Sequence, residues 1–344
     1  PEAELLAVMR HVRFAVMAAG FLRETVGAWP ALGSAEAKDM LFNAMLPSVG
    51  GTKLVQRSGI GPRLIYFVGG ASEDEELRTV ELYDPQAASW TQLTGMAGPR
   101  AFLGCVALEG KLYAVGGEDT EGQSLDTAEV YDPQTNGWQP LAAKMVTERA
   151  AFGLAAMGGK IYAIGGMVDG SIQESVEAYD PQLGSWALVA SMSEKRFAHA
   201  SVVLDGKIYA IGGLGGVPPL DTVEVYDPQA DSWQQVASMP QGLLFHTAAA
   251  MGGKIYVTGG SNQDTLDSVC VYDPQADAWT QLASMSNGRR GHASAVVGGK
   301  LYVFGGSNAD VDLSTAEVYD PASDSWVQVP SLTSGRNSMV AVAL

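Results

Sequence analysis

The chain has 344 residues, of which 47% are hydrophobic, 17% are charged and 41 are glycine, so it is a folded, strand-rich protein and not a disordered one. Its formal net charge of −17 argues against nonspecific binding to nucleic acid and against binding to an anionic membrane surface. No apolar run approaches the length of a membrane-spanning helix.

The first part of the chain has a helical pattern. Apolar residues recur at helical spacing within residues 5–12, and Ser34 fits the N-cap of a further helix. Residues 14–22 have the apolar character of a signal-peptide core, but the helical pattern continues beyond them through charged residues, which disfavours that interpretation. We therefore expect a helical segment over residues 1–45, followed by a Gly, Ser and Pro-rich linker over residues 46–62.

The rest of the chain repeats one unit six times. The double glycines that mark it recur every 46–49 residues, at Gly69–Gly70, Gly116–Gly117, Gly165–Gly166, Gly212–Gly213, Gly259–Gly260 and Gly305–Gly306. Each is followed by Tyr-Asp-Pro, with the tyrosines at Tyr83, Tyr131, Tyr179, Tyr226, Tyr272 and Tyr319. A tryptophan follows each tyrosine by seven residues, at Trp90, Trp138, Trp186, Trp233, Trp279 and Trp326. A period near 50 residues is typical of one four-stranded propeller blade.

Each repeat predicts four strands, A to D. Strand B ends at the double glycine, strand C ends at Tyr-Asp, and strand D carries the tryptophan, which we expect to pack between adjacent sheets. A two-residue turn such as Asp205-Gly206 joins strand A to strand B. Residues 64–68 form a strand B without a preceding strand A, and residues 337–343 form a strand A without a following strand B. We therefore expect the C-terminal strand to complete the first blade and close the ring.

These repeats resemble the kelch family, on the strength of the double Gly, the Tyr-Asp, the Trp at a fixed offset and an Arg after a Met-containing turn. The resemblance implies an all-β fold: a six-bladed kelch β-propeller over residues 63–344, closed by a C-terminal strand and preceded by a short α-helical segment. Three N-terminal segments, LLAVMRHVRF, FLRETV and AEAKDMLFNAM, resemble the last helices of a BACK domain. Because that module stands between a BTB domain and a kelch propeller, the chain is expected to be a fragment of a longer protein.

Two sets of loops are expected to share one face of the propeller: the B–C loops after each double glycine and the D–A loops before each strand A. The B–C loops differ most between repeats, as a recognition surface on a rigid scaffold does, although drift in solvent-exposed loops gives the same pattern. Five D–A loops end in an arginine, at Arg100, Arg149, Arg196, Arg289 and Arg336. In kelch adaptors, arginine here often lines the ligand pocket; alternatively, these side chains bind backbone carbonyls of the inner strands.

The remaining candidate binding residues adjoin that ring. Leu243 replaces the arginine in the fifth repeat, which places an apolar sector in the ring. The other candidates are Arg290, Asn337, Leu244, Phe245, Phe197, Met167 and Leu214. From these residues we expect a short acidic peptide, with one or two Asp or Glu and an aliphatic or aromatic anchor, to bind at the mouth of the central channel.

Metal binding and catalysis have weaker support. His199, His246 and His292 are in register in three repeats, but the equivalent positions elsewhere are apolar, which favours core histidines over metal ligands. Cys105 and Cys270 lie on strand patterns and are expected to be buried and unpaired. No known catalytic motif is present, so no catalytic residue, metal or cofactor is predicted.

The resemblance implies a cytoplasmic protein-binding propeller that recognises substrates for a cullin-RING ubiquitin ligase, in the Ubl conjugation pathway. Contact with a cullin would require a BTB domain, which is absent from these residues. No nucleic-acid or membrane partner is expected. Two alternatives remain open at this point: a kelch-type enzyme acting on a small sugar, similar to a mutarotase, and an actin-binding or scaffolding kelch protein.

Overall fold

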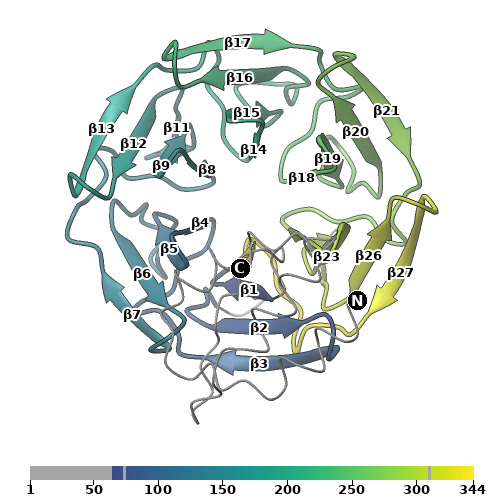
Figure 1. The fold of residues 1–344 in the computed structure, drawn as a ribbon, viewed down its shortest axis with the longest axis horizontal. Helices are drawn as coiled ribbons and strands as arrows, with labels where there is room; N and C mark the ends of the chain where they lie inside the picture. Colours follow the sequence, from purple (N-terminus) through teal and green to yellow (C-terminus); the bar gives the residue numbers. More distant parts are fainter. Residues whose placement is uncertain (1–63, 73–74, 309–310) are drawn as a thin grey trace, which may run out of the picture. The chain divides into compact units, whose positions relative to one another are not determined.

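Each repeat folds into a four-stranded antiparallel sheet, and six such sheets surround a central opening in the computed structural model (Figure 1). The structure describes residues 64–344 except 73–74 and 309–310. The expected helical segment (1–45) and linker (46–62) lie outside the described residues. Among the described residues, no helix is long and apolar enough to cross a membrane.

The sheets, called blades I to VI, are given from the inner to the outer strand. Blade I contains β28 (Val340–Ala343), β1 (Ile65–Val68), β2 (Val80–Asp84) and β3 (Ser89–Leu93). Blade II contains β4 (Gly104–Leu108), β5 (Lys111–Val115), β6 (Ala128–Asp132) and β7 (Gly137–Pro140). Blade III contains β8 (Gly153–Met157), β9 (Lys160–Ile164), β12 (Val176–Asp180) and β13 (Ser185–Val189).

Blade IV contains β14 (Ala200–Leu204), β15 (Lys207–Ile211), β16 (Val223–Asp227) and β17 (Ser232–Val236). Blade V contains β18 (Thr247–Met251), β19 (Lys254–Thr258), β20 (Val269–Asp273) and β21 (Ala278–Leu282). Blade VI contains β22 (Ala293–Val297), β23 (Lys300–Phe304), β26 (Ala316–Asp320) and β27 (Ser325–Val329). Two short hairpins lie within B–C loops: β10 (Met167–Val168) with β11 (Ser171–Ile172), and β24 (Ser307–Asn308) with β25 (Val311–Asp312).

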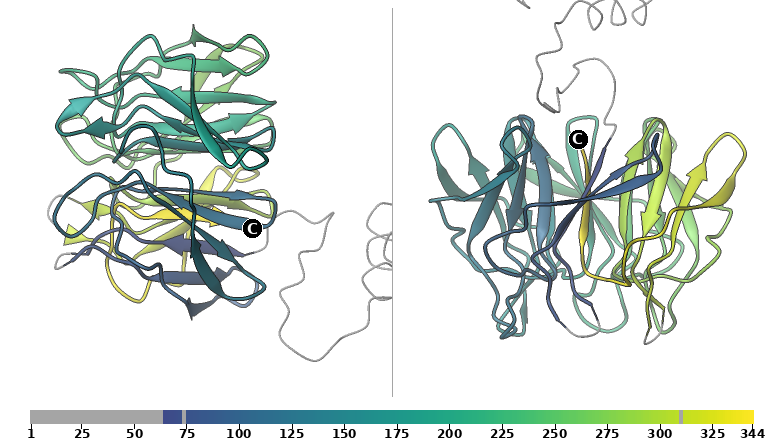
Figure 2. Two further views of the ribbon diagram at one scale, coloured as in Figure 1. Left: turned by 90° about the vertical axis from the view of Figure 1, so that its left-hand side faces the viewer. Right: turned by 90° about the horizontal axis from the view of Figure 1, so that it is seen from below.

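The two ends of the propeller meet in blade I, as predicted. Strand β28 pairs antiparallel with β1, in the register Ile65 to Ala343 and Val68 to Val340 (Figure 2). This pairing gives β1 a neighbour on both sides, so its inner edge is not left open. The A–B turn also has the expected form: Asp205 and Gly206 have φ of 50° and 72°, which a two-residue type I′ turn requires.

Aromatic residues join neighbouring blades. Each of the six repeat tryptophans packs on the tyrosine of its own blade, with ring centroids 4.8–5.3 Å apart. The Trp233 indole N–H also donates to the carbonyl of Ala190 in the preceding blade, and the Tyr226 hydroxyl donates to Asp231. Asp231 in turn accepts the backbone N–H of Ala190. The tryptophans therefore hold the blades together, as the repeat pattern predicted.

Candidate functional site

The B–C and D–A loops lie on one face of the propeller and are joined by backbone bridges. In each blade, the residue after the double glycine pairs with the second residue of the D–A corner. The pairs are Asn337 with Ala71, Ala101 with Glu118, Ala150 with Met167, Phe197 with Leu214, Leu244 with Ser261, and Arg290 with Ser307. The prediction that the two loop sets share one face is therefore correct. We call it the loop face.

A closed ring of backbone hydrogen bonds surrounds the channel where it meets the loop face. One residue from each blade donates its N–H to the carbonyl of its counterpart in the preceding blade, at 2.7–3.3 Å; the six are Phe102, Ala151, Ala198, Phe245, Gly291 and Ser338. All six have φ between 49° and 59°, in the left-handed region. We call this the mouth ring.

Two phenylalanines meet across the mouth ring. Phe102 belongs to blade II and Phe245 to blade V, on opposite sides of the channel (Figure 1), yet their ring centroids are 6.0 Å apart. Phe197 packs edge-on against Phe245, with centroids 6.3 Å apart. A bulky side chain at positive φ is uncommon, and such strain persists only where the surrounding structure holds it. The mouth therefore carries an aromatic cluster set in a strained backbone.

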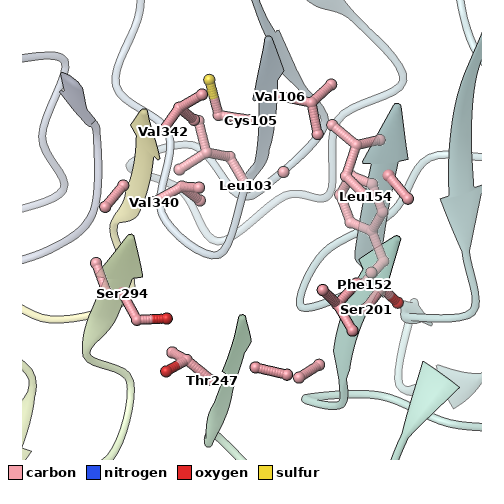
Figure 3. A pocket seen from close by; sticks show the side chains of 18 of the residues that line it. Leu103, Cys105, Val106, Phe152, Leu154, Ser201, Thr247, Ser294, Val340 and Val342 are labelled. Carbon is pink, nitrogen blue, oxygen red and sulfur yellow. The ribbon is translucent and has the colours of Figure 1, made fainter. Parts of the chain in front are cut away.

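The channel below the mouth has a mixed lining of apolar and polar groups. It has a volume of about 560 Å³ and is lined by the inner strands of all six blades. Val106, Leu154 and Val340 line one part of the wall, and Ser201, Thr247 and Ser294 line another part (Figure 3). The Thr247 hydroxyl bonds Thr258 and His292 within the wall.

The five repeated arginines are not exposed in the channel mouth. Arg149, Arg196 and Arg289 are fully buried, and Arg100 and Arg336 are 5% and 3% exposed. Each forms an ion pair at 2.7–3.3 Å with a buried glutamate on strand C of its own blade. The pairs are Arg100–Glu129, Arg149–Glu177, Arg196–Glu224, Arg289–Glu317 and Arg336–Glu81.

Arg149 shows how each guanidinium is used. It donates to the carbonyls of Gly165 and Ser175 at 2.6 and 3.0 Å, to the Ser175 hydroxyl at 2.9 Å, and to Glu177. Glu177 also accepts the backbone N–H groups of Val146 and Thr147. The prediction that these five arginines form an exposed cationic ring is therefore contradicted by their burial. Four of them, Arg100, Arg149, Arg196 and Arg289, donate to a double-glycine carbonyl, as the alternative interpretation predicted, whereas Arg336 donates to the Thr79 hydroxyl.

In blade V, all the parts of this Arg–Glu network are replaced together. Leu243 stands in place of the arginine, Cys270 in place of the glutamate, and both are buried in one apolar cluster. Pro240 occupies the position at which other blades donate an N–H to the glutamate, and proline has no N–H. Donor, acceptor and arginine are thus replaced together, so no buried charge is left without its partner. In the sequence, the signal for these glutamates is the pattern VEVYD in blade IV beside VCVYD in blade V.

The other predicted site residues do lie at the loop face. Phe197, Leu214, Leu244, Met167 and Arg290 are partly buried and belong to the bridged pairs described above. Phe245 is in the mouth ring. Asn337 pairs with Ala71, and its amide donates to Asp312 at 2.7 Å. Blades III to V thus contribute an apolar arc of Met167, Phe197, Leu214, Leu244 and Phe245.

Comparison with known proteins agrees with this architecture. The sequence pattern of the Attractin/LZTR1 beta-propeller family matches residues 65–312. The chain belongs to this family. The structure titled "Structure of YjhT" superimposes on the propeller with a TM-score of 0.67 and 17% identity, over 79% of this chain and 98% of that chain. At this identity the similarity shows the fold alone.

Curated relatives of this propeller are kelch proteins. Zebrafish Kelch-like protein 3 is 32% identical over 121 residues, which are 32% of this chain and 20% of that protein. Zebrafish Kelch-like ECH-associated protein 1A is 34% identical over 114 residues, 33% of this chain and 19% of that protein. Mouse Influenza virus NS1A-binding protein homolog is 42% identical over 67 residues, 18% of this chain and 10% of that protein. The matched segments span a tenth to a fifth of these relatives.

Acidic side chains are a second feature of the loop face of this kelch propeller. The six B–C loops (71–77, 118–125, 167–173, 214–220, 261–266 and 307–313) contain eleven Asp and Glu residues, four of them in the first loop and three in the second. One exposed arginine, Arg78, directly follows the first loop. At the mouth, burial raises the pKa of Glu118, and the charges of Glu76 and Asp119 raise it further. The net charge of the whole chain hides this feature, whereas the charge of each B–C loop taken separately reveals it.

The three histidines lie in the interior of this propeller. His199, His246 and His292 are 6%, 5% and 2% exposed. Burial lowers their pKa values to about 3, 4 and 3, respectively. The prediction that they are core residues is confirmed by this burial, as is the prediction that Cys105 and Cys270 are buried and unpaired. Within the described residues, no group of three or more His, Cys, Asp or Glu could hold a metal ion.

Proposed function

We propose that this kelch propeller is a protein-binding module and that its loop face recognises substrates for a cullin-RING ubiquitin ligase. The observation that carries the proposal is the apolar arc of partly buried side chains around the mouth ring. Aromatic and aliphatic side chains at the centre of a contact surface, with polar groups around them, are the usual anchors of protein interfaces.

The frame beneath the arc supports this role. The bridged pairs and the mouth ring hold the loop bases by backbone hydrogen bonds, and the buried Arg–Glu pairs fix the D–A corners from below. A surface ordered before binding loses less conformational entropy when a partner binds. Phe197 and Leu244 are therefore presented in fixed positions, while the variable B–C loops surround them.

The ligase role rests on the family of the propeller and on the resemblance of residues 1–45 to the end of a BACK domain. In that arrangement the propeller binds the substrate in the cytoplasm, and a BTB domain contacts the cullin.

Selection of random 12-residue peptides displayed on phage, with the whole chain as target, tests protein binding at the loop face. We expect enriched peptides whose affinity falls about tenfold or more on Phe197→Ala, since removing an aromatic anchor typically costs over 1.4 kcal/mol. Leu188→Ala, on the exposed outer strand β13, is the matched control and should leave affinity unchanged. Failure to enrich any peptide, or equal binding to Phe197→Ala, would refute the loop face as the site.

A further inference from the structure

We propose that the loop face selects a basic peptide with an aromatic or aliphatic anchor: the anchor packs on the Phe102–Phe245 pair and the apolar arc, and its Lys or Arg side chains face the B–C loops of blades I and II. This inference rests on the proposed function and names the ligand class. It is opposite in charge to the acidic peptide expected from the sequence.

The anchor position follows from the mouth ring. Blades III, IV, VI and I place Ala151, Ala198, Gly291 and Ser338 in the ring, so its backbone needs only small residues there. Phe102 and Phe245 occupy the same positions with φ of 52° and 54°, although bulky side chains rarely adopt this conformation. Both remain partly exposed, in contact with each other across the channel. Neither aromatic ring is required by the backbone, which points to an external partner for this pair.

The charge of the ligand follows from the loops beside that pair. Glu118 is bridged to Ala101, the residue before Phe102, so its backbone lies beside the mouth ring. Glu75 and Glu76 come from the neighbouring loop of blade I, and Glu121 from the same loop as Glu118. None of the ion pairs formed within the described ranges includes these four glutamates. A cation at this position would meet several carboxylates at once.

The protein's own basic side chains are mostly placed elsewhere. Five lysines at the start of strand B form ion pairs on the opposite face, with the aspartates of Tyr-Asp-Pro; they are Lys111, Lys160, Lys207, Lys254 and Lys300. The five repeated arginines are buried and paired. On the loop face, Lys195 and Arg290 lie in blades IV and VI, outside the two acidic loops, and Lys144 is paired with Asp126. One exposed basic residue, Arg78, adjoins the acidic loop of blade I, between that loop and β2.

Neighbouring groups support this assignment. Burial, Glu76 and Asp119 all raise the pKa of Glu118, which shows that the glutamate lies among like charges. The Asp119 carboxylate accepts the N–H groups of Glu121 and Gln123 in its own loop, so the backbone holds part of the cluster in place. A bound Lys or Arg would offset the repulsion between these carboxylates.

The peptides enriched by the phage selection test the inference. We expect them to carry net positive charge together with Phe, Trp, Leu or Met. In fluorescence polarisation, the variant Glu76→Gln/Glu118→Gln should bind them about fivefold or more weakly at 50 mM salt, with a smaller loss at 300 mM. Phe245→Ala should weaken binding about tenfold at both salt concentrations. Alanine occupies the same position in blades III and IV, so this variant should fold.

The control is Asp205→Asn, which removes one negative charge from the opposite face and keeps a residue type that tolerates positive φ. It should leave binding unchanged. Enriched peptides that are acidic or neutral but depend on Phe245 would overturn the charge inference and leave the proposed function intact. If no peptide is enriched, or if binding is the same in every variant, both are overturned.

Discussion

Copying the composition of blade V into blade III tests how the buried arginines act. Arg149→Leu alone removes the donors to two backbone carbonyls and to the Ser175 hydroxyl. It also leaves the Glu177 carboxylate, which is fully buried, without a cation. Breaking a buried ion pair from one side typically costs about 3–5 kcal/mol, because the remaining charge is desolvated and unpaired. We therefore expect Arg149→Leu to lower the free energy of unfolding by that amount.

The double variant Arg149→Leu/Glu177→Cys should be less harmful than the single one. It reproduces Leu243 and Cys270 of blade V and leaves no buried charge. Replacement of both partners of a buried pair by apolar groups is often close to neutral, so we expect about 2 kcal/mol or more of the loss to be recovered. In the native protein, Glu177 accepts the N–H of Val146 at 2.6 Å, so this N–H loses its acceptor in the double variant. Adding Val146→Pro removes the N–H and should recover about 1 kcal/mol more.

Urea denaturation followed by far-UV circular dichroism measures these differences. Lys160→Met breaks an ion pair whose lysine side chain is 45% exposed and serves as the control; its urea midpoint should hardly change. If the loss of unfolding free energy in the double variant equals the sum of the losses in Arg149→Leu and Glu177→Cys, Arg149 and Glu177 are not coupled. The interpretation of the blade V replacements as one concerted change would then be refuted.

Two further predictions concern the ring and its interior. Deletion of residues 340–344 removes β28 and leaves the inner edge of β1 unpaired, so we expect aggregation or a large fall in melting temperature; an unchanged melting temperature would contradict closure through this strand. The pKa values of the three buried histidines are lowered, so below about pH 6.5 these side chains take up protons in the unfolded chain but not in the folded chain. The free energy of unfolding should therefore fall from pH 6.5 towards pH 4 by about 1.4 kcal/mol per pH unit for each histidine. The variant His199→Leu/His246→Phe/His292→Met replaces them by the apolar residues of the other blades. It should flatten this slope in urea melts at pH 4.5 and 6.5, and an unchanged slope would show that other groups cause it.

Local sequence and its repetition were enough to predict the architecture. The six double glycines and the tryptophan offsets predicted the blades, and the two half-blades at residues 64–68 and 337–343 predicted closure by the last strand. These features are readable because each blade buries the same faces against its neighbours, so the same residue types recur at the same spacing. The apolar residues that replace the three histidines likewise indicated a buried position.

The candidate site was only partly predictable. Phe197, Leu214, Leu244 and Phe245 were expected near the mouth and lie there. The exposure of Arg149 could not be predicted from its own position, because it depends on Glu177, 28 residues away, and on two carbonyls that the fold places around it. Phe102 and Phe245 are 143 residues apart and meet only because closure of the ring sets blades II and V face to face. The sequence by itself determined the repeating frame, whereas the tertiary structure decided which charges are buried in it and which side chains meet at its mouth.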